Sequence, residues 1–426
     1  MKVRLSIRFV FAFGAILFGA INLLGQLEST QYHWLRPADV GVSDFNPGPV
    51  PEYVRPSFRD RINYKPYLPD TLHKKSRPRK YVQMAFHYMN TADTFYTEYE
   101  GQEGQEFARS LVYYMNTHLD RNSPYFLNPD LPVYDPTWRF QLGRKPGTEE
   151  YAVYHHYSDT DYDYLHAGPD VNRSRRNVNK YTEGLDSLLH VFIMAPPRDS
   201  VESPTFKPED PLGLWNGRAI KVTGYYPRLD PWRYRRNLNH EAGHAFGLPH
   251  AWLRRDGCDD TVPHPNRCWN EDDERPGCDT LLSNNVMDYN NYQQALTPCQ
   301  IGRVNATFSR RGGPQRAWIR PDWCQHNPNF TARITQSDEW TGDRDIRGDL
   351  IIKEGVRLRI DCRVHLPSGS RVRIEPGGIL ELGPNALLHN DCGLSWLGLE
   401  LGRDNEREAQ IVTEPGFRIE NISQDQ

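Results

Sequence analysis

The sequence predicts an α+β domain of the α/β type, with a twisted mixed sheet and one site-bearing helix, followed by a small all-β region. Three observations predict it. Strand-like and helix-like periods alternate between about residues 80 and 250, a helical stretch near residue 240 is rich in histidine, and short strands separated by Gly and Pro follow residue 335.

The first domain is predicted from apolar periodicity. Residues 81–89 (YVQMAFHYM) have the composition of a strand, and residues 103–118 place apolar side chains at helical spacing. A second helix is expected to end at Gly247, because glycine readily takes the left-handed conformation that terminates helices. The remaining elements expected here are strands over 151–157, 187–195 and 218–226 and the second helix over 235–246.

The C-terminal region, residues 335–426, is predicted to be all-β. Apolar and charged residues alternate in short runs bounded by Gly and Pro, over 349–360, 369–375 and 378–382. Evenly spaced short strands of this kind indicate either a small β-domain or the first coils of a β-solenoid.

The N-terminus is typical of an exported protein. A basic start and an apolar run over 9–24 predict a signal peptide over residues 1–26, and the run is short for a membrane anchor of ~20 residues. We therefore expect a secreted, extracellular chain without stable membrane association after signal cleavage. The Pro-rich residues 27–78 are interpreted as a leader or pro-segment, with a plain linker as the alternative.

Charge and cysteine content narrow the class of protein. The net charge of −4 gives no indication of a nucleic-acid partner, and nothing in the composition sets the oligomeric state. All seven cysteines follow residue 257, and disulfides persist in oxidising compartments. The odd number leaves at least one thiol outside intramolecular pairs.

The chemistry-bearing motif is NHEAGHAFGLPH, which begins at residue 239. His240 and His244 are four residues apart, so a helix places both imidazoles on one face, where they can bind one Zn²⁺ ion. Glu241 lies between them and can act on a water molecule. Gly247 allows a sharp turn that would bring His250 to the same metal, and three protein ligands leave one position open.

Downstream, residues 286–304 read VMDYNNYQQALTPCQIGRV. With the long histidine motif and the cysteine-containing segment between, this resembles the pappalysin-type metzincins over about 235–305. The resemblance implies a metzincin catalytic domain over 79–325, zinc as cofactor and endopeptidase activity. It also implies that Met287 forms the Met-turn beneath the metal and that Tyr289 assists catalysis beside it.

The same resemblance implies disulfides Cys258–Cys278 and Cys268–Cys299. Some family members hold structural calcium. The loop 253–283 is rich in aspartate and could bind Ca²⁺ through its carboxylates, and a solvated acidic loop is an equal alternative.

The expected function is hydrolysis of protein or peptide substrates by a zinc-activated water with Glu241 as general base. Residues 218–226 are the expected edge strand for an extended substrate. The alternative is a non-catalytic secreted adhesin or binding protein on the same scaffold. The sequence does not indicate the substrate or the cleavage preference. The other histidines, including His87, His156 and His190, are interpreted as ordinary core or surface residues.

Overall fold

The computed structural model describes residues 30–35, 64–68, 79–93, 99–162, 175–182, 185–205, 212–223, 229–265, 268–310, 313–390 and 392–423. The expected signal peptide, residues 1–26, lies outside these ranges. No helix among the described residues has the length and apolar character needed to cross a membrane.

The first domain is built on a six-stranded sheet of order β3-β2-β5-β7-β6, with β4 also paired to β2. The strands are parallel except β6, which runs antiparallel to β7 at one edge. The long strand β2 pairs with β3 along its first half and with β4 along its second half. The bounds are β2 Lys80–Asn90, β3 Trp138–Leu142, β4 Val153–Tyr157, β5 Leu189–Ile193, β6 Gly213–Trp215 and β7 Ala219–Val222.

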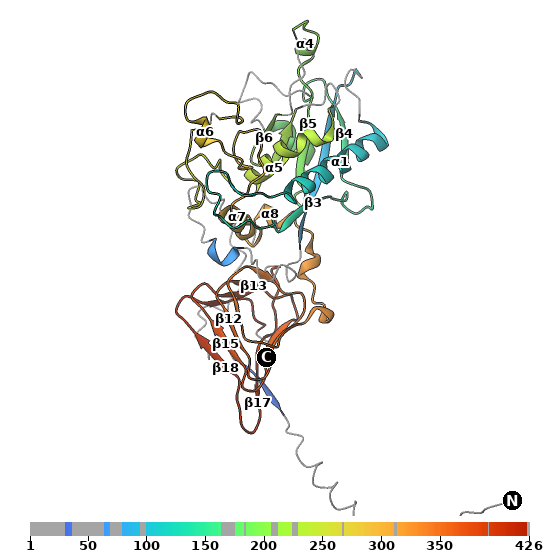
Figure 1. The fold of residues 1–426 in the computed structure, drawn as a ribbon. Coiled ribbons are helices and arrows are strands. Elements are labelled where there is room, and N and C mark those ends of the chain that lie inside the picture. The colour runs from blue at the N-terminus through green and yellow to red at the C-terminus, as the bar shows by residue number, and fades with distance from the viewer. Residues whose placement is uncertain are drawn as a thin grey trace, which may run out of the picture.

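Helices cover both faces of this sheet (Figure 1). Alternate residues of β2 and β5 pack on α1, α5 and α7 in the main core, and the other face packs on α3. Because successive side chains of a strand point to opposite faces of the sheet, each of these strands contributes to the packing on both faces. The helices are α1 Gly101–Leu119, α3 Arg176–Thr182, α4 Arg198–Val201, α5 Arg235–Ala245, α6 Cys278–Leu281, α7 Pro298–Phe308 and α8 Pro314–Ala317, with 3-10 turns at Lys65–Tyr67, Pro231–Tyr234, Pro321–Cys324 and Pro328–Phe330.

The C-terminal region is a parallel coil with three sides. Each turn of the chain contributes one strand to each of three sheets, in the orders β17-β14-β11-β8, β10-β13-β16-β19 and β18-β15-β12-β9. Leucine, isoleucine and valine side chains fill its interior. The expectation that this region is the start of a β-solenoid stays a prediction. The strands are β8 Ala332–Ile334, β9 Asp338–Trp340, β10 Arg344–Asp345, β11 Leu350–Ile352, β12 Arg357–Ile360, β13 Arg363–His365, β14 Arg371–Ile374, β15 Ile379–Leu382, β16 Leu387–His389, β17 Gly398–Arg403, β18 Gln410–Thr413 and β19 Arg418–Ile419.

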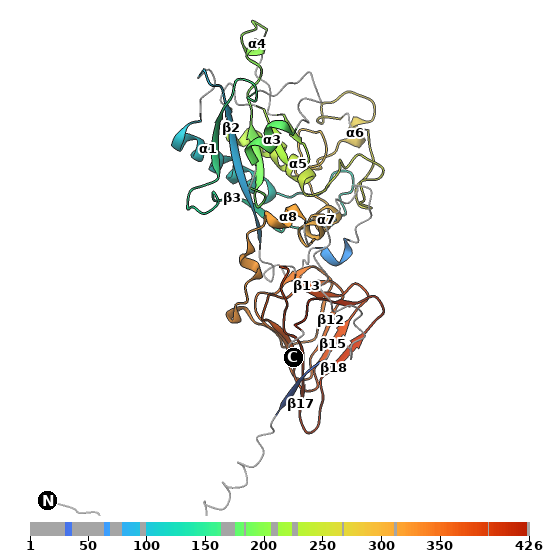
Figure 2. The same cartoon turned by 180° about the vertical axis from the view of Figure 1, so that it is seen from behind.

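The coil and the first domain lie one below the other (Figures 1 and 2). The ammonium group of Lys80, the first residue of β2, lies 3.4 Å from the carboxylate of Asp345 in β10, and both side chains are buried. A disulfide between Cys324 and Cys392 joins the 3-10 turn before the coil to the turn after β16. Cys362 is a buried free thiol inside the coil.

Two described pieces of the Pro-rich segment 27–78 contact these domains. Strand β1, Gln31–Trp34, pairs antiparallel with β17 on the coil. The carbonyl of Tyr67 accepts a hydrogen bond from Asn305 of α7, at 3.1 Å. The interpretation of residues 27–78 as a leader or pro-segment stays a prediction, with a plain linker as its alternative.

Two sequence expectations were wrong in detail. The predicted edge strand 218–226 contains β7, which lies inside the sheet between β5 and β6; its residues 224–226 lie outside the described ranges. The edge on that side is the short strand β6, which the sequence analysis missed because three residues are too few for a visible alternation. The run 349–360 is two strands, β11 and β12, separated by a turn.

Candidate metal centre

The three histidines of the motif converge in space. Helix α5 carries His240 and His244 one turn apart, and the chain leaves the helix through Gly247, whose φ of 91° is left-handed. This reversal returns His250 to the helix face. The Nε2 atom of His244 lies 3.1 Å from Nε2 of His240 and 3.1 Å from Nε2 of His250. These three residues form a group whose ligand atoms could hold one metal ion.

Two of the imidazoles are oriented by backbone carbonyl groups. The Nδ1 atom of His240 lies 2.8 Å from the carbonyl oxygen of Val286, and Nδ1 of His244 lies 2.8 Å from that of Leu248. A ring that donates Nδ1–H keeps its Nε2 lone pair free, which is the tautomer that a metal ligand requires. The third ring, that of His250, stacks on Trp252 with ring centroids 3.9 Å apart.

The electrostatics of the site keep these imidazoles neutral. Burial, and then the neighbouring His244, hold the pKa of His240 well below its usual value. Burial lowers the pKa of His244, and burial followed by His244 lowers that of His250 to about 3. Neutral imidazoles are the form that binds a metal, so the residues fit a nitrogen-ligated divalent cation such as zinc.

Glu241 lies beside the histidines, at the edge of the sheet. Its Oε2 accepts a hydrogen bond from the backbone N–H of Trp215 in β6, at 2.6 Å. Burial raises the pKa of this carboxyl to about 7, and the Trp215 hydrogen bond opposes the rise. A carboxyl with its pKa near neutrality can both take up and release a proton at physiological pH.

Met287 and Tyr289 also lie at the site. The fully buried sulfur of Met287 packs against Gly243 so closely that a Cβ at that glycine would collide with it. Met287 therefore supports α5 between its two histidines. The ring of Tyr289 is solvent-exposed, with its centroid 5.4 Å from the His240 ring and 5.1 Å from the His250 ring.

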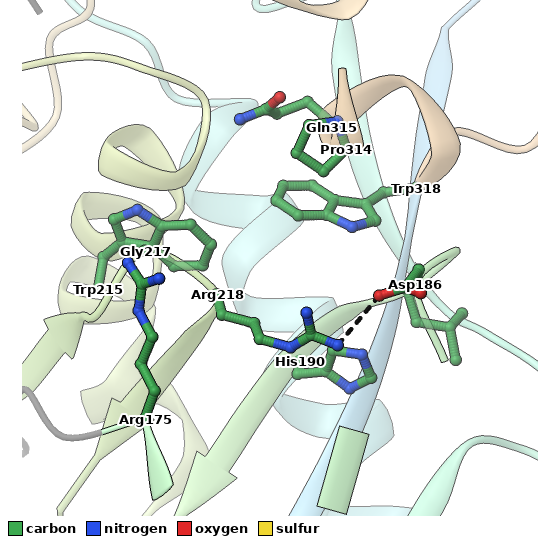
Figure 3. A pocket seen from close by; sticks show the side chains of 10 residues that line it. Arg175, Asp186, His190, Trp215, Gly217, Arg218, Pro314, Gln315 and Trp318 are labelled. Carbon is green, nitrogen blue, oxygen red and sulfur yellow. Dashed lines mark hydrogen bonds and ion pairs between the residues drawn. The ribbon is translucent and has the colours of Figure 1, made fainter. Parts of the chain in front are cut away.

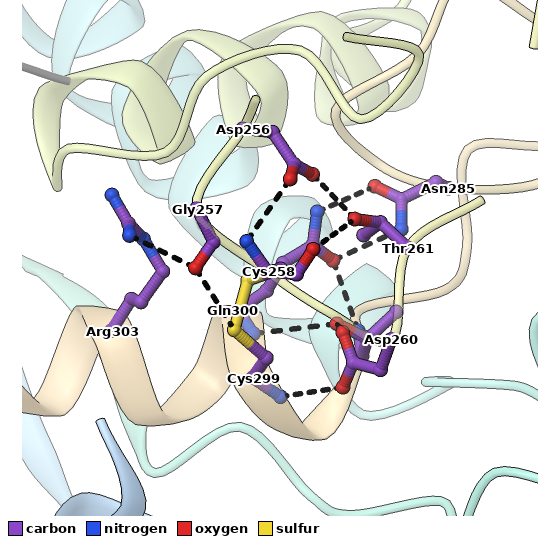
Figure 4. Close-up of a disulfide and its surroundings, with 10 residues drawn as sticks. Asp256, Gly257, Cys258, Asp260, Thr261, Asn285, Cys299, Gln300 and Arg303 are labelled. Carbon is purple, nitrogen blue, oxygen red and sulfur yellow. Dashed lines mark hydrogen bonds between the residues drawn. A yellow bond between two sulfur atoms is a disulfide. The ribbon is translucent and has the colours of Figure 1, made fainter. Parts of the chain in front are cut away.

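The disulfides around the loop after the motif differ from the expected pairing. Cys258 bonds to Cys299 (Figure 4). Cys268 bonds to Cys278. Cys258 is brought to the start of α7 because Asp260 accepts hydrogen bonds from the Cys299 N–H and the Thr297 hydroxyl, at 2.8 and 2.7 Å. The pairing that the family resemblance implied, Cys258–Cys278 and Cys268–Cys299, is therefore wrong. Sequence spacing alone permits three pairings of four cysteines.

Three carboxylates of this loop, those of Asp256, Asp260 and Asp273, accept hydrogen bonds from within the protein. Asp256 accepts from the Cys258 N–H at 3.0 Å and from the Thr261 hydroxyl at 2.5 Å (Figure 4). The group Cys258, Asp260 and Cys299 could also be considered for a metal, but its two sulfur atoms are joined to each other. Calcium binding by the loop therefore stays a prediction, without support from the geometry of these residues.

A pocket of about 180 Å³ opens beside the edge strand, and His240, His244 and His250 are not among its lining residues. The indoles of Trp215 and Trp318 line it in an edge-to-face arrangement, with centroids 6.1 Å apart. Arg218 and Asp186, which also line it, form an ion pair at 3.0 Å (Figure 3). Trp215 thus has two roles: its backbone N–H donates to Glu241, and its side chain lines this pocket.

Sequence reasoning missed the backbone contributors to the site. Val286, Leu248 and Trp215 act through carbonyl or amide groups, which every residue carries, so no residue type indicates them. Trp252 lies two residues after the motif and could have been noticed as an aromatic neighbour of His250.

The fold and these groups together define a protein with a candidate metal centre, formed by one helix and a returning loop under a mixed sheet. No protein-family model matches the chain, and no curated protein matches it.

Solved structures of mirolysin are similar to it at a low level. Mirolysin in complex with compound 9 gives a TM-score of 0.39 at 13% identity, covering 57% of this chain and 96% of that chain. Mature mirolysin of Tannerella forsythia with a cleaved peptide gives 0.36 at 14% identity, covering 57% and 96%. A promirolysin mutant from the same organism gives 0.35 at 14%, covering 58% and 87%. Likeness at this level does not assign a function, so the function rests on the geometry of the site.

Proposed function

We propose that the chain is a secreted zinc-dependent endopeptidase of the metzincin type, similar to the pappalysins. The observation that carries the proposal is the convergence of three imidazoles beside the Glu241 carboxyl. The Nε2 atom of His244 lies 3.1 Å from those of His240 and His250, and the ligand atoms of all three lie within 4.8 Å of one another. Nitrogen atoms this close, with Nδ1 of two rings on carbonyl oxygens, form the donor set of a catalytic zinc site with an open position.

When bound, zinc would supply the polarisation of a water molecule and of the substrate carbonyl. Glu241 then acts as general base and takes the proton of the attacking water. Its second role is to deliver that proton to the leaving amine. The hydrogen bond from Trp215 fixes one carboxyl oxygen and leaves the other for proton transfer. Tyr289, on the exposed rim, is positioned to donate a hydrogen bond to the oxygen that gains charge.

The free edge of β6 is the place where an extended peptide would pair. Leu214 faces Lys221 of β7, and Asn216 N–H bonds to the Ala219 carbonyl, so these even-numbered residues use their backbone groups inside the sheet. The N–H and C=O of Gly213 and the C=O of Trp215 therefore point outward. The N–H of Trp215 is used by the Glu241 carboxylate. An extended substrate can pair with the outward groups by strand addition beside Glu241.

The experiment compares the purified parent chain with Glu241→Gln. The parent is expected to contain about one equivalent of zinc and to cleave a peptide library, with loss of cleavage in the presence of a chelator. Glu241→Gln is expected to retain the zinc and to lose nearly all cleavage, because the amide cannot accept the proton.

Two results would contradict the proposal. Cleavage by Glu241→Gln at the parental rate would remove the proposed base. A zinc-loaded parent that cleaves no peptide in the library would instead favour a binding protein on this scaffold.

A further inference from the structure

A second cavity lies at the opposite edge of the sheet from β6. Its volume is about 510 Å³, which is within the range of small-molecule binding pockets. Its walls come from β3, the early part of β2, Arg109 and Val112 of α1, and the segment after α8, none of which contributes a histidine to the candidate metal centre.

Three arginines line this cavity: Arg109 from α1, Arg144 after β3 and Arg320 after α8. No carboxylate is among its described lining residues. Neither Arg109 nor Arg144 forms an ion pair with a described carboxylate. The positive charges of Arg109 and Arg144 therefore line the cavity, and no carboxylate among its described lining residues neutralises them.

Tyrosine rings hold these guanidinium groups in place. The Cζ atom of Arg109 lies 4.6 Å from the centroid of the Tyr151 ring, and that of Arg144 lies 4.1 Å from the same centroid. The backbones of Arg144 and Tyr151 face each other in an antiparallel bridge, which fixes this stacking. Arg320 lies 4.7 Å above the Tyr81 ring and donates to the side-chain oxygen of Gln141 at 2.9 Å.

A cation stacked on an aromatic face keeps the edge of its guanidinium group available for hydrogen bonds. That edge matches the two oxygens of a carboxylate. Arg144 uses Nη1 to donate to the carbonyl of Glu149, and its other N–H groups are the donors considered for a ligand. Val112, Phe140 and Leu142 form an apolar part of the wall, beside the side chains of Gln83 and Gln141. Such a wall favours an apolar body attached to the anionic group.

We propose that this cavity is a binding site for a carboxylate attached to an aromatic or apolar group, held by Arg109, Arg144 and Arg320. Two sources have this chemistry: a free aromatic acid, and the C-terminal carboxylate of a peptide that ends in an apolar residue. The site is independent of the proposed peptidase activity, and binding is measured without it.

The test is calorimetric titration of the full chain, at fixed ionic strength, with sodium benzoate, sodium acetate and N-acetylphenylalanine. Benzoate and N-acetylphenylalanine are expected to bind more tightly than acetate, because only they present an apolar body. The tighter of the two identifies the source as a free acid or as a peptide terminus.

Arginine variants locate the binding. The double variant Arg109→Gln and Arg144→Gln is expected to weaken binding of the tighter probe by roughly tenfold or more, since charge-assisted hydrogen bonds are lost. Arg333→Gln, on an exposed position of β8, is the matched control and should bind as the parent does. Thermal midpoints of all variants check that they are folded.

A second variant, Tyr151→Leu, keeps both charges and removes their common platform. It is expected to weaken binding as well, and it serves if the double variant fails to fold. The proposal is overturned if neither aromatic probe binds the parent. It is equally overturned if the folded arginine and Tyr151→Leu variants bind both probes as tightly as the parent does.

Discussion

The carboxyl of Glu241 and the backbone nitrogen of Trp215 are 2.6 Å apart, which connects the helix of the candidate metal centre to the edge strand of the sheet. This contact depends on the absence of a side chain at Gly213. A Cβ there would lie 2.8 Å from Cγ of Glu241 and would also collide with the side chain of Asn237.

Gly213→Ala is therefore expected to displace β6 or Glu241 and to reduce peptide cleavage by roughly tenfold to a hundredfold, because a small misplacement of a catalytic group has a cost of this order. Zinc content should remain at the parental level, since no histidine moves. Leu212→Ala, at the exposed neighbouring position, is the control and should cleave within about twofold of the parent. Parental activity in Gly213→Ala would show that the contact does not position the carboxyl.

The disulfide pairing has a direct consequence for stability. The bridge Cys258–Cys299 spans 41 residues and Cys268–Cys278 spans 10. Loop-closure entropy then predicts losses of about 4 and about 3 kcal/mol on removal of each bridge. The double variant Cys258→Ser and Cys299→Ser should therefore have a lower thermal midpoint than the double variant Cys268→Ser and Cys278→Ser.

Peptide mapping under non-reducing conditions checks the pairing itself. A linked peptide containing Cys258 and Cys278 would contradict the structure at this loop.

A row of three histidines on the other face of the sheet makes stability sensitive to acid. His87 lies between His156 and His190, with nitrogen atoms 2.9 and 3.0 Å apart. Burial holds the pKa of His87 well below its usual value, and lowers those of His156 and His190 to about 4. The prediction that these histidines are core or surface residues agrees with this burial, but their contact was not foreseen.

The sign follows from proton uptake. Above pH 6.5 these rings are neutral in the folded and unfolded states, and stability does not change. Between pH 6.5 and about 4 the unfolded chain binds protons that the folded chain does not, so stability falls as pH falls. His190→Gln should flatten this decline by an amount on the order of 1–3 kcal/mol, measured as urea midpoints at pH 7.5 and 5. An unchanged slope would show that His190 takes up its proton in the folded state.

The buried ion pair between Lys80 and Asp345 holds the first domain to the coil. Asp345 also accepts from Arg363 at 2.5 Å. Lys80→Met removes one charge from a buried pair and is expected to cost about 3–5 kcal/mol of the free energy of unfolding. Arg79→Met, next to it in sequence but paired with Asp120 on the surface, should cost less than about 1 kcal/mol.

Equal unfolding midpoints for Lys80→Met and Arg79→Met would contradict the assignment.

The residues of the metal centre could be read from the sequence because their geometry is local. The spacing of His240 and His244 on a helix, with a glycine before His250, sets the three imidazoles through one helical turn and one chain reversal. Long strands with clear periodicity, such as β2, and the helices α1 and α5 were also predictable, since local spacing specifies them. The short strands β3 and β6 lack a period long enough to recognise.

The sequence by itself determined the three histidines of the candidate metal centre, the main helices and the all-β character of the C-terminal coil. Only the tertiary structure decided which strand is the free edge, which cysteines pair, and which arginines share a cavity. Each of these depends on residues far apart in the chain being packed together, and local spacing carries no information about such contacts. The same holds for the amide of Trp215, whose role comes from its place against Glu241 and not from its side chain.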